Sequence, residues 1–301
     1  ALVYSSHNRC QHIHRDWIVE RALQSHNNKT ILYLPMSMGK MDQQEYSWGT
    51  FRWYFDPFRK WGLEPLNFYW QEGMDSSDVD MLFDWLLNSE VVILGGGSST
   101  LGMQRYTALG ERYYGDPSLF GRILHQRQNA GKLTAGFSAG ADQLCEYLVG
   151  TQQKIAGYGL AHRIMSTLHH EWGQRDYLKQ LAMSSPLNLL FGLPNDSGFA
   201  VDQGYLPSGN IWQMIEFITD SSWDLPNDAF HIKTRQGMTI EHFYCDGRRW
   251  DFLGGDQMVR ILDPNGHDQE AWILRDGYPI LYYWSQEPTG YESVEEILAS
   301  H

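Results

Sequence analysis

The chain has 301 residues, of which 42% are hydrophobic and 14% aromatic, so it holds enough apolar material for a sizeable core. Its formal charge of -13 argues against nucleic acid or an anionic membrane as the main partner, because phosphate groups require a basic face. The sequence contains no run of about 18 uncharged apolar residues, so we expect no membrane span.

The N-terminus and the cysteines favour a reducing compartment. Residues 1–5 lack a basic region followed by an apolar block, so they do not resemble a signal peptide, although a processed one could already be absent. The three cysteines, Cys10, Cys145 and Cys245, are odd in number and widely spaced. This fits neither a disulfide framework nor a Cys-x-x-Cys metal site, so we expect a cytoplasmic protein.

The first two-thirds of the chain alternates strand and helix patterns after a short apolar start at residues 1–4. Compact apolar runs predict buried strands, and apolar residues at helical spacing predict helices. The expected strands are 30–35, 64–69, 90–94 and 132–135. The expected helices are 15–24, 45–61, 76–88, 118–129 and 141–148. Apolar strands separated by helices indicate a mainly parallel sheet covered on both faces, so we predict a three-layer α/β sandwich.

After about Val201 the sequence becomes rich in Trp, Tyr, Gly and Asp. Hairpin-type turns such as Asp246-Gly247 separate short candidate strands there. These strands are expected at 238–244, 258–262, 271–274 and 280–284. We therefore predict an α/β domain over residues 1–202 and a β-rich C-terminal extension over residues 203–301, either a subdomain or an elaboration of the sheet edge.

The stretch Gly136-Phe137-Ser138-Ala139-Gly140 matches the Gly-x-Ser-x-Gly pattern of a nucleophile elbow. A nucleophile on a sharp strand-to-helix turn has a strained backbone, and small residues two positions before and after it avoid clashes. The expected helix directs its N-terminal amides at the serine, which favours negative charge there. Ser138 is the candidate nucleophile and the Ala139 amide a candidate oxyanion donor, with an inert serine in a tight turn as the alternative.

A second glycine-rich turn, Gly95-Gly96-Gly97, directly follows the expected strand 90–94. Three glycines let the backbone approach a ligand and expose its amides. Gly96 or Gly97 is therefore the candidate for the second oxyanion donor, with a plain tight turn as the alternative. A phosphate loop is not favoured, because the chain lacks a Gly-Lys-Ser/Thr loop here and does not match Gly-x-Gly-x-x-Gly in register.

In this order and spacing, the two turns resemble the serine peptidase family of dipeptidase E (aspartyl dipeptidase) and cyanophycinase. Looser matches follow at 159–170 and 191–196, so the resemblance covers roughly residues 1–202. It implies a class I glutamine amidotransferase-like fold in which serine replaces cysteine as the nucleophile, with no cofactor.

The resemblance also implies a catalytic histidine at the end of an apolar strand a few tens of residues after the nucleophile. The matching segment, 164–170, ends in His169 and His170. Strand alternation sends adjacent side chains to opposite faces, so only one of them can face Ser138. An ungapped match selects His170, and His169 is kept in reserve.

The acidic third member of such a triad is missing from its expected positions. The resemblance places it at Gln153 or Asn195, and neither residue carries a charge. Asparagine can orient an imidazole, although it stabilises the imidazolium less than a carboxylate does. Asp196, adjacent in sequence, is the candidate substitute.

By resemblance, the expected activity is hydrolysis of an amide bond in a small peptide or isopeptide through a Ser138 acyl-enzyme. The resemblance also implies a substrate that contains aspartate, either as α-Asp-X or as a β-linked Asp-Arg unit. Because the triad position that should be acidic is uncharged, the alternative is a binding protein on the same fold that has lost catalytic activity. We expect a small peptide or isopeptide substrate and no nucleic-acid or membrane partner, and a homodimer is left open.

Two further alternatives come from composition. The 12 Trp and 17 Tyr suggest carbohydrate binding, but aromatic residues more often serve cores and interfaces. His7, Cys10, His12 and His14 cluster near the N-terminus, yet their spacing matches no standard zinc pattern, so we expect a solvated loop and no metal.

Overall fold

The computed structural model describes residues 1–6, 11–26, 28–220 and 237–301, which form two sheets and their covering helices. The larger sheet contains β1 Leu2–Tyr4, β2 Thr30–Leu34, β3 Glu64–Asn67, β4 Val91–Leu94, β5 Leu133–Phe137, β8 Ser197–Tyr205, β9 Ile211–Thr219, β12 Gln257–Leu262, β13 Asp268–Arg275 and β14 Tyr278–Tyr282. The smaller sheet contains β6 Ile164–Leu168, β7 Leu189–Leu193, β10 Ile240–Phe243 and β11 Arg249–Phe252.

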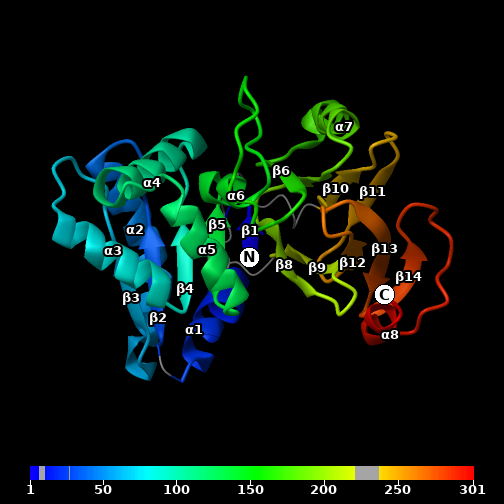
Figure 1. Cartoon of the computed structure of the whole chain (residues 1–301), viewed down its shortest axis with the longest axis horizontal. Coiled ribbons are helices and arrows are strands. Elements are labelled where there is room, and N and C mark those ends of the chain that lie inside the picture. Colours follow the sequence, from blue (N-terminus) through cyan, green and yellow to red (C-terminus); the bar gives the residue numbers. More distant parts are fainter. Residues whose placement is uncertain (7–10, 27, 221–236) are drawn as a thin grey trace.

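The α-helices are α1 Glu20–Gln24, α2 Met41–Phe55, α3 Ser76–Asn88, α4 Ser99–Tyr114, α5 Leu119–Asn129, α6 Ala139–Leu144, α7 Arg175–Ser184 and α8 Val294–Ala299. Three shorter helical segments are η1 Ile13–Val19, η2 Asp56–Trp61 and η3 Trp172–Gln174. In Figure 1, α1–α5 surround the strands at one end of the molecule, and the antiparallel strands of the C-terminal third lie at the other end. Among the described residues, none of the helices has the length and apolar character needed to cross a bilayer.

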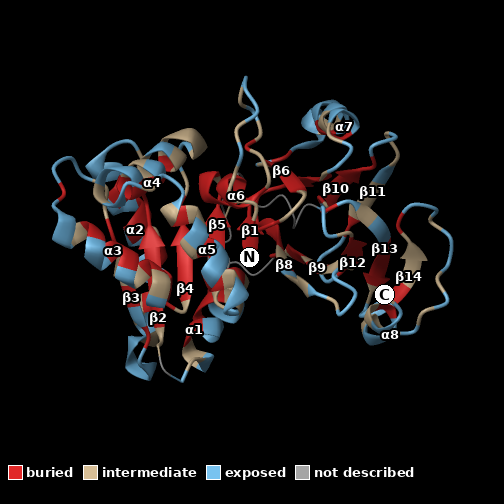
Figure 2. Cartoon of the chain, viewed as in Figure 1, coloured by how far each residue is buried: buried red, intermediate tan, exposed pale blue. Residues whose placement is uncertain are grey.

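The parallel strands are covered by helices on both faces, which confirms the predicted α/β class. In β2, Ile31 and Tyr33 belong to the apolar cluster that includes Phe51 of α2. Leu32 of the same strand belongs to the opposite cluster, together with Leu82 of α3. Successive side chains of a strand point to opposite faces, so a strand that is apolar at every position is buried by helices on both faces of the sheet. Figure 2 shows these strands buried and the outward helix faces exposed.

The larger sheet is mixed, so the prediction of a mainly parallel sheet is wrong. Its strand order is β14-β13-β12-β9-β8-β1-β5-β4-β2-β3. Strand β1 is the boundary, because it pairs in parallel with β5 and antiparallel with β8. From β8 onward each neighbour is antiparallel, and β8 and β9 are joined by a short turn that contains Gly209 at φ 88°. Short turns can join only antiparallel neighbours, whereas parallel strands need long crossovers.

The C-terminal strands lie close to their predicted positions, as β10, β12, β13 and β14. Of the two alternatives for this region, the structure supports an elaboration of the sheet, since β12–β14 extend the larger sheet beyond β9. Strands β10 and β11 instead join β7 and β6 in the smaller sheet. The predicted boundary between residues 202 and 203 falls inside β8.

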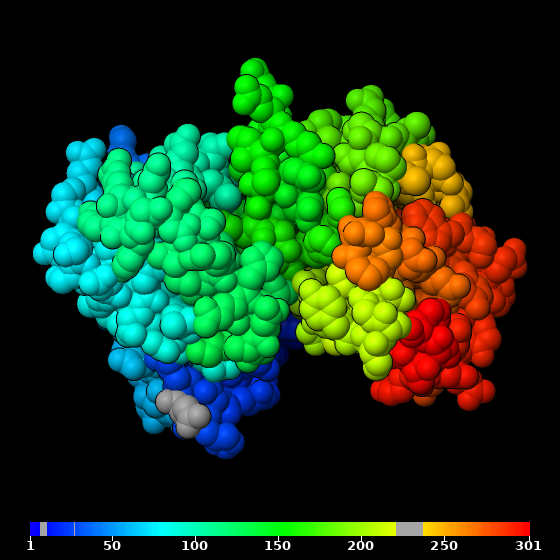
Figure 3. Space-filling view, viewed as in Figure 1, coloured from blue at the N-terminus to red at the C-terminus, as the bar shows by residue number. Residues whose placement is uncertain are grey.

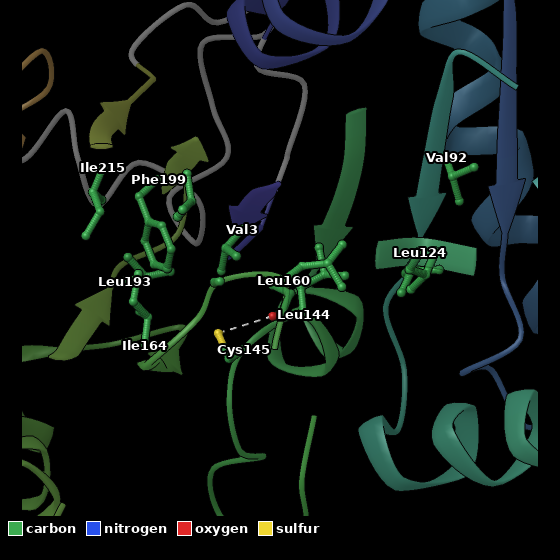
Figure 4. Packing of buried hydrophobic residues seen from close by; sticks show 14 of the residues in the cluster. Val3, Val92, Leu124, Leu144, Cys145, Leu160, Ile164, Leu193, Phe199 and Ile215 are labelled. Carbon is green, nitrogen blue, oxygen red and sulfur yellow. Dashed lines mark hydrogen bonds between the residues drawn. The ribbon is translucent and has the colours of Figure 1, made fainter. Parts of the chain in front are cut away.

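One apolar cluster links the two halves of the molecule (Figure 4). It runs from Val92 of β4 and Leu124 of α5, past Val3 of β1, to Leu193 of β7 and Ile215 of β9. Both sheets are therefore packed against shared side chains, which holds their strand ends in fixed relation. In the space-filling view, the green segment between α6 and β6 projects from the surface (Figure 3).

Several helices differ from expectation. Helices α4, α7 and α8 have no counterpart among the predicted elements, and in α4 the internal glycines weaken the helical pattern. Gly102 is required there, because a Cβ at this position would overlap the side chains of Gln143 and Ser37. Helix α6 was expected at 141–148 but begins at Ala139 and ends at Leu144, so the elbow leads directly into it.

Candidate active site

Ser138 lies on a strained turn between β5 and α6. Its backbone has φ 52° and ψ -115°, a conformation that non-glycine residues rarely adopt. A Cβ on Gly136 would overlap the backbone of Gly140, and a Cβ on Gly140 would overlap the carbonyl of Leu94. The two glycines therefore let α6 approach the strands closely enough to form the sharp turn. The turn matches the geometry predicted for a nucleophile elbow.

His169 is the histidine that contacts Ser138. Its Nε2 lies 2.9 Å from Ser138 Oγ, and its side chain is exposed. The residue follows β6 at φ 52°, and its backbone N–H donates to Ser5 Oγ at 2.7 Å. A hydroxyl within this distance of an imidazole nitrogen has the geometry required for proton transfer to a general base.

Asn195 completes a hydrogen-bonded chain with His169 and Ser138. Its Oδ1 lies 2.7 Å from His169 Nδ1, and its side chain is only 3% exposed. With Nδ1–H donating to this amide oxygen, the lone pair of Nε2 faces the Ser138 hydroxyl. The imidazole therefore has the tautomer that a base for Ser138 needs, although its partner is a neutral amide.

The expected placement of His170 against Ser138 is wrong. His170 is fully buried on the opposite side of the chain, where Nε2 lies 2.8 Å from Glu241 Oε2. The two histidines do point in different directions, as strand alternation requires, but β6 ends one residue before His169. The left-handed backbone of His169 then turns its side chain toward Ser138. This turn is not visible in an ungapped sequence match.

His170 and Glu241 form a buried pair, to which the partly exposed Arg175 adds an ion pair. Glu241 accepts hydrogen bonds from His170 and from Arg175, whose Nε lies 2.8 Å from Glu241 Oε1. Burial alone would raise the pKa of Glu241, but the bonds from His170 and Arg175 outweigh it and lower the pKa to about 2. A Cβ on Gly192 would meet the His170 ring, so the ring packs on bare backbone. His170 thus anchors the chain directly after His169.

The other two candidates for the third member lie elsewhere. Asp196 is buried beside Asn195 at φ 63°, and its backbone N–H donates to the Ser6 carbonyl at 3.0 Å. The hydrogen bonds of the His169 ring go to Ser138 and Asn195, not to Asp196. Gln153 is exposed on the projecting segment between α6 and β6. Of the three candidates, the structure brings only Asn195 into contact with the histidine.

The glycine turn lies directly beside the candidate nucleophile, Ser138. A Cβ built on Gly96 would lie 3.4 Å from Ser138 Cβ and 3.9 Å from its Oγ. Gly97 has φ 130°, and a side chain there would overlap the Ser37 carbonyl. In the described part of the chain, the amides of Gly96, Gly97 and Ala139 have no acceptor. These amides and Ser138 thus meet at one edge of the sheet, as an oxyanion site requires.

Sequence reasoning missed the contribution of β1 to this site. The Tyr4 carbonyl accepts the Ser138 backbone N–H at 3.1 Å, and Ser5 Oγ accepts the His169 N–H. Strand β1 and Ser5, the residue directly after it, thereby hold both the candidate nucleophile and the candidate base. The central position of β1 between β5 and β8 explains this role. A short apolar run at the start of the sequence does not by itself predict a central strand.

A cavity of about 810 Å³ opens beside Ser138. It extends from Ser5 and the glycine turn to helix α2, with Tyr46, Trp53 and Tyr54 in its wall. Its volume is within the range typical of small-molecule sites, roughly 300–1,000 Å³. Ser138 therefore faces a space that a small substrate can enter.

Only some of the residues of the candidate metal site near the N-terminus lie within the described part of the chain. His7 and Cys10 lie outside the described residues. Within the described ranges, no group of three His, Cys, Asp or Glu side chains is arranged to hold a metal ion. His14 is buried instead, with its ring stacked on Tyr54 at a centroid distance of 3.9 Å. Cys145 is buried and Cys245 exposed, and both are free thiols.

Comparison with known sequences finds neither a protein-family model nor a curated protein that matches this chain.

Proposed function

We propose that this chain is a serine hydrolase that cleaves an amide bond in a small peptide or isopeptide, with a glutamine amidotransferase-like arrangement of its nucleophile. The observation that carries the proposal is the hydrogen-bonded chain from Ser138 through His169 to Asn195. It stands on a strained elbow, beside three amides and a cavity. An inert serine in a tight turn would not require this convergence of separate segments.

The proposed reaction starts with proton transfer from Ser138 Oγ to His169 Nε2 while Oγ attacks the amide carbonyl carbon. The amides of Ala139 and of Gly96 or Gly97 stabilise the oxyanion, a contribution typically worth about 10²–10³-fold per donor. His169 then protonates the leaving nitrogen as the C–N bond breaks. Water, deprotonated by His169, hydrolyses the acyl-enzyme and releases Ser138.

Aspartate remains the substrate residue that the family resemblance implies, either as α-Asp-X or as a β-linked unit. Hydrolysis of a dipeptide panel that contains both linkages tests this choice directly. Ser138→Ala is the control, and the substitution is small enough to leave the fold intact. Undiminished hydrolysis by that variant would refute the role of Ser138.

The choice of base gives a sharper test. His169→Ala is expected to lower kcat/KM by about 10²–10⁴-fold without loss of stability, because the side chain is exposed and acts as a general base. The measurement is hydrolysis together with the rate of Ser138 labelling by a fluorophosphonate. His267→Ala is the matched control, since His267 is exposed in a C-terminal turn. Equal labelling rates in the His169→Ala and control variants contradict the proposal.

A binding protein on the same fold is the second candidate function. The neutral amide of Asn195 favours it, because asparagine stabilises an imidazolium less than a carboxylate does. Labelling separates the two functions, since an unactivated serine reacts poorly with a fluorophosphonate. Wild-type protein that stays unlabelled but binds small amides supports the binding protein.

A further inference from the structure

The cavity beside Ser138 has one wall made by a single face of helix α2. Tyr46, Thr50 and Trp53 lie four and three positions apart, so they share one side of the helix, and all three line the cavity. Tyr46 is 76% exposed and Trp53 57% exposed, although both are large aromatic side chains. Their rings are therefore available to a ligand that enters beside Ser138.

Gly49 creates space on this same wall. It lies within α2 and lines the cavity, and a Cβ built on it would meet no atom within 4 Å. Glycine weakens a helix interior relative to alanine, so the helix does not require it for stability. No close backbone approach requires it either. Its visible consequence is room in the cavity between Tyr46 and Trp53.

The chemistry of the lining is uncharged. The described residues that surround the cavity are aromatic, hydroxyl-bearing or small, together with Met38, and none of them is Asp, Glu, Lys or Arg. Tyr33 and Ser47 close part of the wall with a mutual hydrogen bond of 2.5 Å. Burial raises the pKa of the Tyr33 phenol above its ordinary value, so this group is also neutral. A charged substrate group would lose its hydration here without an ionic partner among these residues.

We infer that this cavity binds an uncharged aromatic side chain of the substrate, next to the scissile amide, and not the aspartate that the family resemblance implies. The inference rests on the proposed function only because Ser138 marks where that amide lies. Aromatic rings pack edge-to-face and offset-stacked against one another, which suits the exposed faces of Tyr46 and Trp53. The same rings could hold a cation through its attraction to their π-faces, but the described lining offers no carboxylate to neutralise it.

Equilibrium binding to the Ser138→Ala variant tests the inference without turnover. N-acetyl-phenylalaninamide, N-acetyl-aspartamide and N-acetyl-lysinamide share their amide groups and differ only in side chain. Isothermal titration calorimetry should give the phenylalanine compound an affinity about tenfold or more above the other two, from burial of its ring. Tighter binding of the aspartate or lysine compound overturns the inference, and so does binding of none of them.

A substitution of Gly49 locates the binding. In the Ser138→Ala background, Gly49→Leu places a side chain in the open space and should reduce affinity for the phenylalanine compound by about tenfold or more, with no loss of thermal stability. Gly290→Leu is the matched control, because Gly290 also has open space around it and lies in the C-terminal region. Equal effects of the two substitutions refute this location.

The proposed function and the inference fail in different experiments. Absence of fluorophosphonate labelling at Ser138 in wild-type protein removes the hydrolase but leaves the aromatic binding to be measured in Ser138→Ala. Conversely, a labelled and active enzyme that shows no preference for the phenylalanine compound keeps the hydrolase and refutes the aromatic site.

Discussion

The choice between His169 and His170 depends on the backbone of one residue. His169 has φ 52°, outside the extended region of the strand that precedes it. This one conformation sends its imidazole to Ser138, while His170 enters the buried cluster with Glu241. Both residues are histidines, so composition and motif cannot separate them. Left-handed conformations of non-glycine residues carry strain, and at functional sites the surrounding contacts maintain them. Here, Ser5 Oγ accepts the His169 N–H.

The neutral amide of Asn195 leads to a prediction at the same scale. Asn195→Asp places a carboxylate next to His169 Nδ1, where Asn195 Oδ1 now lies at 2.7 Å. The carboxylate stabilises the imidazolium, so the acid limb of the pH–kcat/KM profile should move to higher pH by about 1–2 units. Activity on the plateau should rise rather than fall, because the negative charge stabilises the imidazolium that forms during attack.

The matched control for this prediction is Asn265→Asp, which makes the same change of charge at an exposed turn. Its profile should overlay that of the wild type. An unchanged acid limb in Asn195→Asp would mean that Asn195 does not orient the His169 imidazole during the proposed reaction.

At the scale of elements, the elbow depends on close packing between α6 and the strands. Gly140→Ala puts a methyl group into the Leu94 carbonyl, where only backbone can move. Overpacking of this kind costs about 1–3 kcal/mol, and it should also displace Ser138. Urea denaturation should therefore show a lower free energy of unfolding, and fluorophosphonate labelling should slow.

Gly290→Ala serves as the control for the elbow substitution, because a Cβ there meets open space. It should unfold within about 0.5 kcal/mol of the wild type, as surface substitutions usually do. Equal stability of Gly140→Ala and Gly290→Ala would contradict the packing argument.

At the scale of the whole molecule, the cluster of the buried His170 and Glu241 with Arg175 links segments of the smaller sheet. Glu241 lies on β10, His170 follows β6, and Arg175 begins α7. Strand β7 lies between β10 and β6, so the cluster spans three strands. The position of the exposed His169 is therefore stabilised by residues that do not themselves contact Ser138.

This cluster predicts a pH dependence of stability. The pKa of Glu241 is lowered from its ordinary value of 4.5 to about 2. A lowered carboxyl pKa stabilises the folded state above the unfolded value, and that stabilisation is lost as the pH falls from 4.5 toward 2. At pH 7, Glu241→Gln should lower the free energy of unfolding by about 3 kcal/mol, because it removes the carboxylate that pairs with the buried His170 and with Arg175. At pH 3 the difference from the wild type should shrink.

The measurement is urea denaturation of wild type and variant at the two pH values, with Glu287→Gln as the control. Glu287 is exposed, so its substitution should change stability little at either pH. A destabilisation by Glu241→Gln that stays constant from pH 7 to pH 3 would show that the carboxylate charge is not its cause.

Much of the fold was predictable because its signals are local. The apolar runs of β2 and β4 and the helical stripe of α3 lie within a few residues of sequence, and the structure has these elements where they were expected. The mixed sheet was not predictable in this way. Whether β1 accepts β8 as an antiparallel neighbour depends on partners about 200 positions apart, since Leu2 pairs with Ala200.

The sequence by itself determined the elbow at Ser138 and the glycine turn beside it, because each needs only small residues next to a strand end. The tertiary structure decided which histidine and which third residue complete the site. Ser138 and His169 are 31 positions apart, and His169 and Asn195 are 26 apart. Only the packing of the two sheets fixes where those side chains meet. The uncharged aromatic cavity beside Ser138 follows from the same packing, because α2 reaches Ser138 only in the folded chain.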